Sequence, residues 1–178
     1  MDKTKYNVFR LDGHNFSRLT KENFKKPFDI SFNDAMKECA MYLYEKFNFK
    51  LCFVGSDEIS LIYYPIPQSK IDSGTGFDFN GKLFKYMSIL VSASSSKFAL
   101  KTGIMNSFDC RHFAYDTLEQ IREYLIFRRI CTVKNSKMML AQHYFSYKQL
   151  YGHTSNEAVE MLLKEKDIDY YEIVEESI

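Results

Sequence analysis

The feature that most constrains the fold is a pair of apolar runs separated by four polar residues. Leu51–Val54 and Ile59–Tyr64 flank the sequence Gly55-Ser56-Asp57-Glu58. Two apolar runs around a short polar break predict a β-hairpin, here with two carboxylates at its turn. Because an unpaired carboxylate is costly to bury, Asp57 and Glu58 indicate that something cationic lies at this turn.

A second apolar segment also runs into an acid. Tyr6–Leu11 is rich in β-forming residues and closes at Asp12-Gly13. Along the chain the patterns predict a strand, a helix, two strands, a helix and a strand, followed by further helices. The predicted elements span 6–11, 31–47, the hairpin 51–64, 81–102 and 108–115. This βαββαβ order predicts an α+β, ferredoxin-like antiparallel sheet with helices on one face plus C-terminal helices.

This topology brings two of the carboxylates together. Its first and third strands are antiparallel neighbours in the middle of the sheet, so Asp12 should lie beside Asp57, 45 residues further along the chain (57 − 12). Mg²⁺ favours one or two carboxylates with phosphate oxygens, and two such ions suit phosphoryl transfer. The carbonyl of Gly13 is a further candidate ligand. The alternative is that Asp12-Gly13 is only a turn and Asp57-Glu58 only a hairpin tip.

The remaining segments give weaker signals. We expect His14–Asp29 to be an irregular connection, either a solvated loop pinned by its phenylalanines or a surface that contacts phosphates and bases. The capping-box spacing of Asp116–Glu119 predicts a long helical region towards Tyr151. A kink or break is expected at Thr132–Ser136, where helix propensity is low. Thr154–Glu157 repeats the capping box and opens a last helix.

Composition excludes several classes of protein. The net charge of +1 over 178 residues gives no global attraction to nucleic acid or membrane. The four cysteines contain no C-x-x-C pair, which argues against a zinc site and a disulfide scaffold. No apolar run approaches membrane-spanning length, and no signal-type segment follows Met1. We therefore expect a cytoplasmic protein that does not enter a membrane.

Three sequence blocks carry a resemblance to a known family. Arg10–Phe16 (RLDGHNF), Asn23–Asp29 (NFKKPFD) and Gly55–Glu58 (GSDE) resemble the tRNA(His) guanylyltransferase superfamily of 3′-to-5′ nucleotide polymerases. Later blocks are also similar, namely Lys82–Lys85, Ser92–Ser94, Phe108–Arg111 and Tyr124–Arg129. The resemblance implies a polymerase palm-like fold, with residues 1–178 as a single catalytic domain and a C-terminal helical extension from about residue 117.

The resemblance also implies roles for individual residues. Asp12, Asp57 and the Gly13 carbonyl would bind two Mg²⁺ ions, with the two aspartates as catalytic residues. Residues implied to contact nucleotide are Arg10, His14, Asn15, Phe16, Phe24, Lys25, Lys26, Asp29, Ser56, Glu58, Lys82 and Lys85. Residues implied to contact RNA or triphosphate are Arg128, Arg129, Lys134, Asn135 and Ser136. Glu58 would lie next to the metal site without being a ligand.

The implied reaction is template-dependent 3′-to-5′ addition of nucleotides to the 5′ end of tRNA. ATP would activate the 5′ phosphate, and GTP or another nucleoside triphosphate would be added. Val133–Ser136 lacks the histidine of the His-Ile-Asn-Asn motif found in enzymes that add guanosine to tRNA(His). The chain is therefore similar to the guanylyltransferase-like branch, which repairs 5′-truncated tRNAs. The family also implies a homo-oligomer, either a tetramer or a dimer.

Three other functions remain open. One is a palm-type nucleotidyltransferase or cyclase that acts on free nucleotides, and another is guanosine addition to tRNA(His). The third is a non-catalytic protein that binds RNA or nucleotides, against which the presence of both Asp12 and Asp57 argues.

Overall fold

The structure, a computed structural model, describes residues 1–175. Four strands form one antiparallel sheet in the order β2-β3-β1-β4. Their bounds are β1 Tyr6–Gly13, β2 Leu51–Gly55, β3 Glu58–Tyr63 and β4 Phe108–Tyr115. The two apolar runs and the polar turn between them form β2 and β3, and β3 is buried along its whole length. The sheet is the predicted antiparallel α+β sheet, with β1 and β3 paired at its centre.

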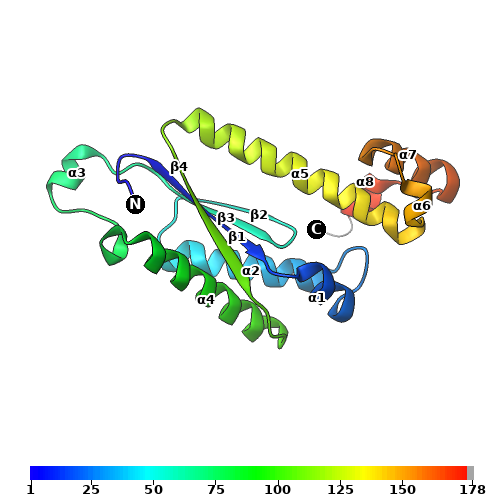
Figure 1. The fold of residues 1–178 in the computed structure, drawn as a ribbon, viewed down its shortest axis with the longest axis horizontal. Helices are drawn as coiled ribbons and strands as arrows, with labels where there is room; N and C mark the ends of the chain where they lie inside the picture. Colours follow the sequence, from blue (N-terminus) through cyan, green and yellow to red (C-terminus); the bar gives the residue numbers. More distant parts are fainter. Residues whose placement is uncertain (176–178) are drawn as a thin grey trace.

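Helices lie against both faces of the sheet. α2 (Ile30–Lys46) and α4 (Leu83–Thr102) pack on one face, and α5 (Leu118–Tyr144) runs along the other (Figure 1). Successive strand residues point to opposite faces, so Phe9 belongs to the main core while its neighbour Val8 packs with residues of α5. The predicted helices α2 and α4 thus lie on one face of the sheet, and α5 covers the other face.

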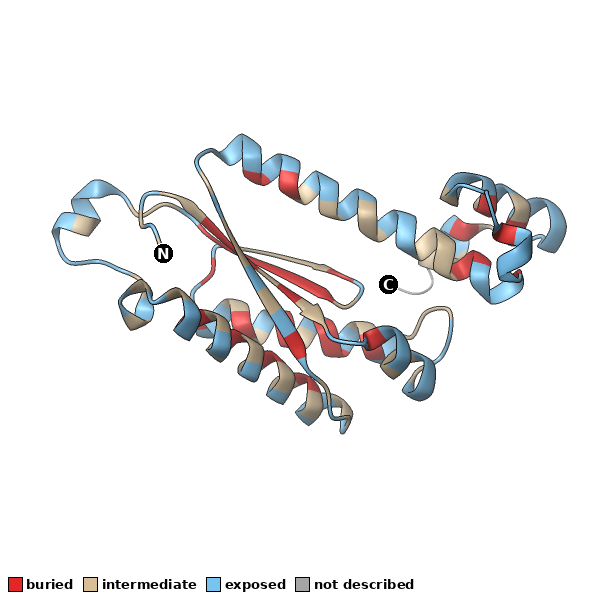
Figure 2. Cartoon of the chain, viewed as in Figure 1, coloured by how far each residue is buried: buried red, intermediate tan, exposed pale blue. Residues whose placement is uncertain are grey.

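α5 continues beyond the sheet, and three short helices gather at its far end (Figure 1). They are α6 (Tyr147–Leu150), α7 (Ser155–Lys166) and α8 (Tyr170–Glu175). Their buried residues form a small core separate from the sheet core, with Leu140, Phe145, Leu150, Leu162 and Tyr170 among its members. The middle of α5, between these two cores, is half-buried or exposed (Figure 2).

The connection expected to be irregular contains a helix, so that prediction was wrong. α1 (Phe16–Asn23) begins after Asn15, whose left-handed backbone turns the chain, and it buries only Phe16. Two turns with a single buried anchor give too short a pattern to be recognised in sequence. The remaining elements are α3 (Gln68–Asp72) and the 3₁₀ turn η1 (Asp78–Gly81).

α5 is uninterrupted, and the break predicted at Thr132–Ser136 is absent from it. The Thr132 hydroxyl donates to the Arg128 carbonyl at 3.0 Å, and the Ser136 hydroxyl donates to the Val133 carbonyl at 2.9 Å. Because these side chains are satisfied within the helix and pack against neighbouring elements, tertiary contacts override their low propensity.

The helix ends follow local signals. The capping box of α5 is formed by Thr117 and Gln120, one residue later than predicted, and the one predicted at Thr154–Glu157 is confirmed. The helical region expected to reach Tyr151 divides after Tyr144 into α5 and α6. Among residues 1–175, no helix has both the length and the apolar composition needed to cross a membrane.

Candidate active site

The candidate site lies where β1 ends beside the turn between β2 and β3. Asp12 is opposite Glu58 in the β1–β3 register, and the Gly13 amide donates to the Asp57 carbonyl at 3.0 Å. The turn itself is Ser56-Asp57, with Ser56 in the left-handed region at φ 55°. The structure therefore places Asp12 and Asp57 side by side at one end of the two central strands.

Electrostatics at this end of the sheet favour a bound cation. Burial raises the pKa of Asp57, and the neighbouring negative charge of Asp12 raises it further, while Ser56 and Lys26 act in the opposite direction. Within residues 1–175 no ion pair neutralises either aspartate. The same residues contain no group of three or more His, Cys, Asp or Glu side chains able to hold a metal. A metal ion here would need oxygen ligands beyond these two carboxylates.

Glu58 has a structural partner. Its buried carboxylate accepts a hydrogen bond of 2.8 Å from Arg128 Nε and is also paired with Arg128 Nη2, while Arg10 Nε lies 3.7 Å away. Burial raises the pKa of Glu58 against the opposing effect of the two arginines. Two residues expected to contact nucleotide or triphosphate, Arg10 and Arg128, are thus directed at Glu58, and Glu58 is not free to bind a metal.

This ion pair fastens α5 to the sheet. Beside it, the Tyr124 hydroxyl of α5 and the Ser60 hydroxyl of β3 are hydrogen-bonded at 2.7 Å. Further along α5, Thr132 lies so close to Gly55 that a Cβ atom added to Gly55 would overlap the Thr132 hydroxyl. α5 is therefore held at a fixed distance from the hairpin that carries Asp57.

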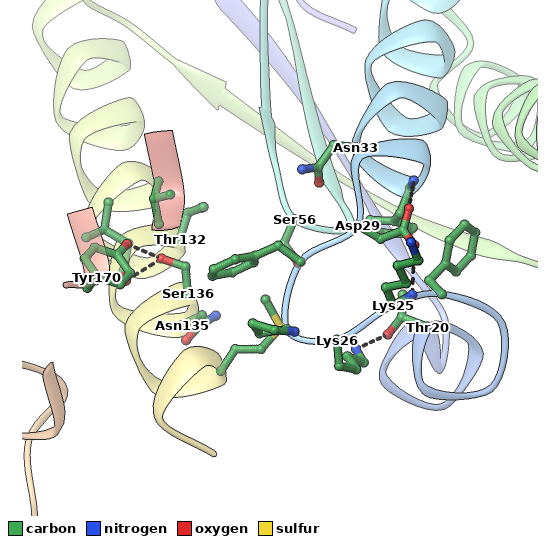
Figure 3. A pocket seen from close by; sticks show the side chains of 17 residues that line it. Thr20, Lys25, Lys26, Asp29, Asn33, Ser56, Thr132, Asn135, Ser136 and Tyr170 are labelled. Atoms are coloured by element: carbon green, nitrogen blue, oxygen red, sulfur yellow. Dashed lines mark hydrogen bonds between the residues drawn. The ribbon is translucent and has the colours of Figure 1, made fainter. Parts of the chain in front are cut away.

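A cavity of about 310 Å³ opens between this part of α5 and the connection from α1 to α2 (Figure 3). Of the residues predicted to bind nucleotide or RNA, those that line it are Phe24, Lys25, Lys26, Asp29, Ser56, Asn135 and Ser136. Its lining is mostly apolar, and polar side chains lie on both walls, as in small-molecule sites. The cavity size matches the lower range of ligand pockets.

One wall of the cavity is shaped by Asp29. Its carboxylate accepts hydrogen bonds from the Ser31 and Lys25 amides, both at 2.8 Å, so it caps α2 and folds the preceding loop. On the same wall, Lys26 Nζ donates to the Thr20 hydroxyl at 2.7 Å. Burial lowers the pKa of Lys26, while the charge of Asp57 raises it. Lys26 therefore lies between the cavity and the two aspartates.

A second hollow, of about 660 Å³, adjoins the first and contains Asp57. The two share several residues, including Lys26, Ser56 and Asn135. Gln142 and His143, near the end of α5, line the second hollow but not the first cavity. Asp57 is thus reached from a space large enough for a group additional to the occupant of the first cavity.

Several predicted residues lie elsewhere. α4 ends just before β4, and β4 begins opposite Gly13, so the 20-residue α4 places its start about 30 Å from the aspartates. Lys82 and Lys85 are at that distant start, where the N-terminal amine donates to Gly81. Arg129 and Lys134 line a different groove, between α5 and the beginning of α7.

None of the three residues after Gly13 lines the cavity, although Phe16 lines the second hollow with Asp57. His14 and Asn15 line an open hollow on the other side of α1. Phe16 is 1% exposed and belongs to the core between the sheet and the helices α2 and α4. Its ring lies against Gly13, so a Cβ atom added to Gly13 would overlap the ring. The close approach explains why residue 13 is glycine.

Sequence reasoning missed part of the cavity wall. Thr132 and Met139 line it together with Ser136, at spacings of three and four residues along one face of α5. Tyr170 of α8 also lines it, and its hydroxyl is hydrogen-bonded to the Ser136 hydroxyl at 2.5 Å. The helical spacing was visible in the sequence, but an expected break at these positions concealed it.

The chain is similar to known proteins in sequence and in fold. Residues 1–116 match the family model described as tRNAHis guanylyltransferase. The chain is 32% identical to the uncharacterized protein R259 of Acanthamoeba polyphaga mimivirus, over 65% of this chain and 40% of that protein. It is 30% identical to the tRNA(His) guanylyltransferase of Saccharomyces cerevisiae, over 93% of this chain and 76% of the yeast protein.

Among solved structures, a bacterial tRNA(His) guanylyltransferase-like protein in complex with ATP has a similar fold. The TM-score is 0.88 at 28% sequence identity, and the match covers 97% of this chain and 76% of the bacterial chain. This chain thus spans less than half of the viral relative and about three quarters of the yeast and bacterial ones.

Proposed function

Because this chain belongs to the tRNA(His) guanylyltransferase family, a family of nucleotidyltransferases, we propose that it adds nucleotides to the 5′ end of tRNA in the 3′-to-5′ direction. The addition follows the opposite strand, as in 5′-end repair. The observation that carries the proposal is the second hollow, which contains Asp57 beside the Asp12 carboxylate and adjoins the cavity. Within this proposal the sheet serves as a polymerase-like palm, and residues from about 117 onwards extend one catalytic domain.

The cavity suits the nucleotide that activates the RNA. Its apolar lining, including Phe24 and Pro27, fits a base, and Lys26 is placed to contact phosphate near Asp57. The similar bacterial structure is a complex with ATP, which supports ATP as the activating nucleotide. The adjoining hollow then takes the RNA 5′ end and the incoming GTP or other nucleoside triphosphate.

The two aspartates suit Mg²⁺. A buried carboxylate beside a second one favours a cation, and Mg²⁺ takes few protein ligands when substrate phosphates supply the others. Asp12 and Asp57, with the Gly13 carbonyl, would hold two ions. Bound there, the ions would neutralise charge on the attacking and leaving oxygens.

The proposed reaction has two steps. A 5′-phosphate oxygen of the RNA attacks the α-phosphorus of ATP, and pyrophosphate leaves. The 3′-hydroxyl of the incoming nucleotide then attacks the activated 5′ phosphorus, and AMP leaves. Positive charge from Lys26 stabilises the phosphates, and the apolar walls of the cavity exclude water from the activated end.

The main alternative is a nucleotidyltransferase or cyclase that uses free nucleotides, because the same cavity and aspartates would serve it. Guanosine addition to tRNA(His) is a further alternative, although Val133–Ser136 lacks the histidine motif of that activity. These activities differ in product. Templated repair gives an RNA whose added base follows the opposite strand, a cyclase consumes nucleotide without RNA, and guanosine addition ignores the template.

The test uses 5′-monophosphorylated RNA with a shortened 5′ end, ATP, labelled nucleoside triphosphates and Mg²⁺. We expect template-directed elongation that stops on chelation and falls at least 100-fold in Asp12→Asn and Asp57→Asn. Asp116→Asn is the matched control, because this exposed carboxylate pairs with Lys5 away from the site. Full activity in Asp57→Asn contradicts the assignment of the metal site, and nucleotide turnover that ignores RNA favours the cyclase alternative.

A homo-oligomer forms part of the proposal. Lys82 and Lys85 are too far from Asp57 to contact its substrates within one chain, so their implied role requires a second copy. Light scattering after size-exclusion chromatography measures the oligomeric state. A monomer that is fully active would remove both lysines from the site.

A further inference from the structure

One stretch of the C-terminal half contains no negative charge. Residues 124–156, here called the acid-free segment, hold five Lys or Arg residues and no Asp or Glu. Because the whole chain carries +1, the remainder carries −4 (1 − 5). The segment comprises most of α5, all of α6, the turn before α7 and the first two residues of α7. Arg128 is paired with Glu58, but the other four cations leave this part of a nearly neutral chain positive, which favours contact with a polyanion.

The outer end of the acid-free segment exposes two aromatic rings. Tyr147 and Tyr151 are 78% and 74% exposed, and their ring centroids lie 6.0 Å apart at an interplanar angle of 60°. Lys148 lies between them in sequence and is also exposed. We call Tyr147, Lys148 and Tyr151 the tyrosine patch. Its rings are free to stack on other planar groups.

The patch is carried by a fixed element. Phe145 lies just before α6 and Leu150 is its last residue; they are 4% and 5% exposed and belong to the small core at the far end of α5. Ser146 and Gln149 form a capping box across α6. The backbone below the two tyrosines is therefore held in place, so binding to the rings would need little ordering of the chain.

The patch also continues from the candidate active site. On the α5 side, the hollow that contains Asp57 ends at Gln142 and His143. From Thr132, next to the Asp57 hairpin, to Tyr144 the helix advances by about 18 Å. A strand that begins at Asp57 and follows α5 therefore arrives at the tyrosine patch.

We propose that the tyrosine patch binds the unpaired nucleotides at the RNA end on which the enzyme acts. The inference rests on the proposed function, since an RNA that lacks 5′ nucleotides leaves unpaired bases in its opposite strand. Tyrosine rings stack on such bases and lysine contacts the backbone, the combination typical of single-strand binding. In a symmetric contact with a second copy, the same positively charged surfaces would face each other, which disfavours that occupant.

The test measures RNA binding directly, without requiring turnover. The probe is a 5′-monophosphorylated RNA hairpin with a single-stranded 3′ end, compared with the same hairpin made blunt. We expect Tyr147→Ala/Tyr151→Ala to weaken binding of the first hairpin about 10- to 100-fold and to leave the blunt hairpin nearly unchanged. Tyr147→Phe/Tyr151→Phe keeps the rings and should retain affinity, which also guards against a loss caused by misfolding.

Two further variants separate stacking from charge and from general effects. Lys148→Ala should lower the slope of log affinity against log salt by about 0.7, whereas the double alanine variant should leave that slope unchanged. Tyr64→Ala is the matched control, because Tyr64 is 41% exposed and forms a ring contact with Tyr6 at the other end of the sheet. Its affinity for both hairpins should equal that of the wild type.

The outcomes distinguish the patch from the proposed function. Unchanged affinity in the double alanine variant, or an equal loss on both hairpins, overturns the proposal. Loss of an oligomer with RNA affinity intact assigns the surface to a second copy and also overturns it. If the double alanine variant selectively loses binding of the hairpin with the single-stranded end, and the wild-type protein adds no nucleotide, the patch is supported and the proposed function is refuted. Wild-type protein that binds neither hairpin overturns both.

Discussion

Replacing Gly55 by alanine tests how closely α5 must approach the hairpin. A Cβ atom at this position would overlap the Thr132 hydroxyl and lie 3.1 Å from both Thr132 Cγ2 and a ring carbon of Phe53. Thr132 is held by its hydrogen bond to the Arg128 carbonyl, and Arg128 is held by Glu58. The clash is therefore relieved mainly by moving α5 away from the sheet.

The expected magnitude follows from the contact distances. Carbon atoms pack at about 3.5–4.0 Å, so the helix must move by on the order of 1 Å. Overpacking of this kind costs about 1–3 kcal/mol of unfolding free energy. A shift of about 1 Å in the wall of a substrate site lowers activity by up to about 100-fold. Both effects should appear together in Gly55→Ala.

Thr132→Ala supplies the matched second change, because it removes both Thr132 atoms that the new Cβ would meet and leaves only the Phe53 ring carbon. Urea unfolding and the kcat/KM for ATP are measured for both single variants and for the double variant. We expect the double variant to recover about 1–2 kcal/mol of the stability lost in Gly55→Ala, as an interaction between contacting residues. Additive stability losses, or a Gly55→Ala protein with normal stability and kinetics, would refute the close-approach argument.

The remaining predictions concern the charged groups. Asp57→Asn should raise the urea midpoint at neutral pH. Burial and the charge of Asp12 raise the pKa of Asp57, so the stability linked to this carboxyl is present at low pH and is lost as pH rises through the folded-state pKa. The gain should vanish in acid, and equal midpoints at neutral pH contradict it. Glu58→Gln should lower the unfolding free energy by about 3 kcal/mol by leaving Arg128 partly buried and unpaired, and Glu58→Met/Arg128→Met should recover most of it. Lys26→Met should raise the KM for ATP about 10-fold with unchanged stability, an effect that steady-state kinetics measures.

The sequence was most informative about the sheet. Short apolar runs with polar turns predicted all four strands, and the βαββαβ order placed Asp12 beside Asp57. These inferences succeeded because strand pairing follows from local pattern and a small set of topologies. The role of the two aspartates in metal binding stays a prediction.

The arrangement of the helices was less accessible. The break expected in α5 was inferred from propensity, yet the bonds of Thr132 and Ser136 within the helix and the contact of Ser136 with Tyr170 outweigh it. Lys82 and Lys85 were grouped with the site by the family resemblance, and the length of α4 places them at the other end of the sheet. Neither result could come from a sequence pattern, because both depend on contacts between distant segments.

The two halves of the candidate site therefore depend on different contacts. The aspartates are brought together by strand pairing, which would persist if α5 were displaced. The cavity exists only while α5 stays in place, and its place is set by Glu58 with Arg128, 70 residues apart, and by Gly55 with Thr132. A chain that keeps the aspartates but loses these contacts should still bind a divalent cation weakly and should no longer hold a nucleotide. For this reason we expect loss of Glu58, whose carboxylate is occupied by Arg128, to impair the proposed activity through the position of α5.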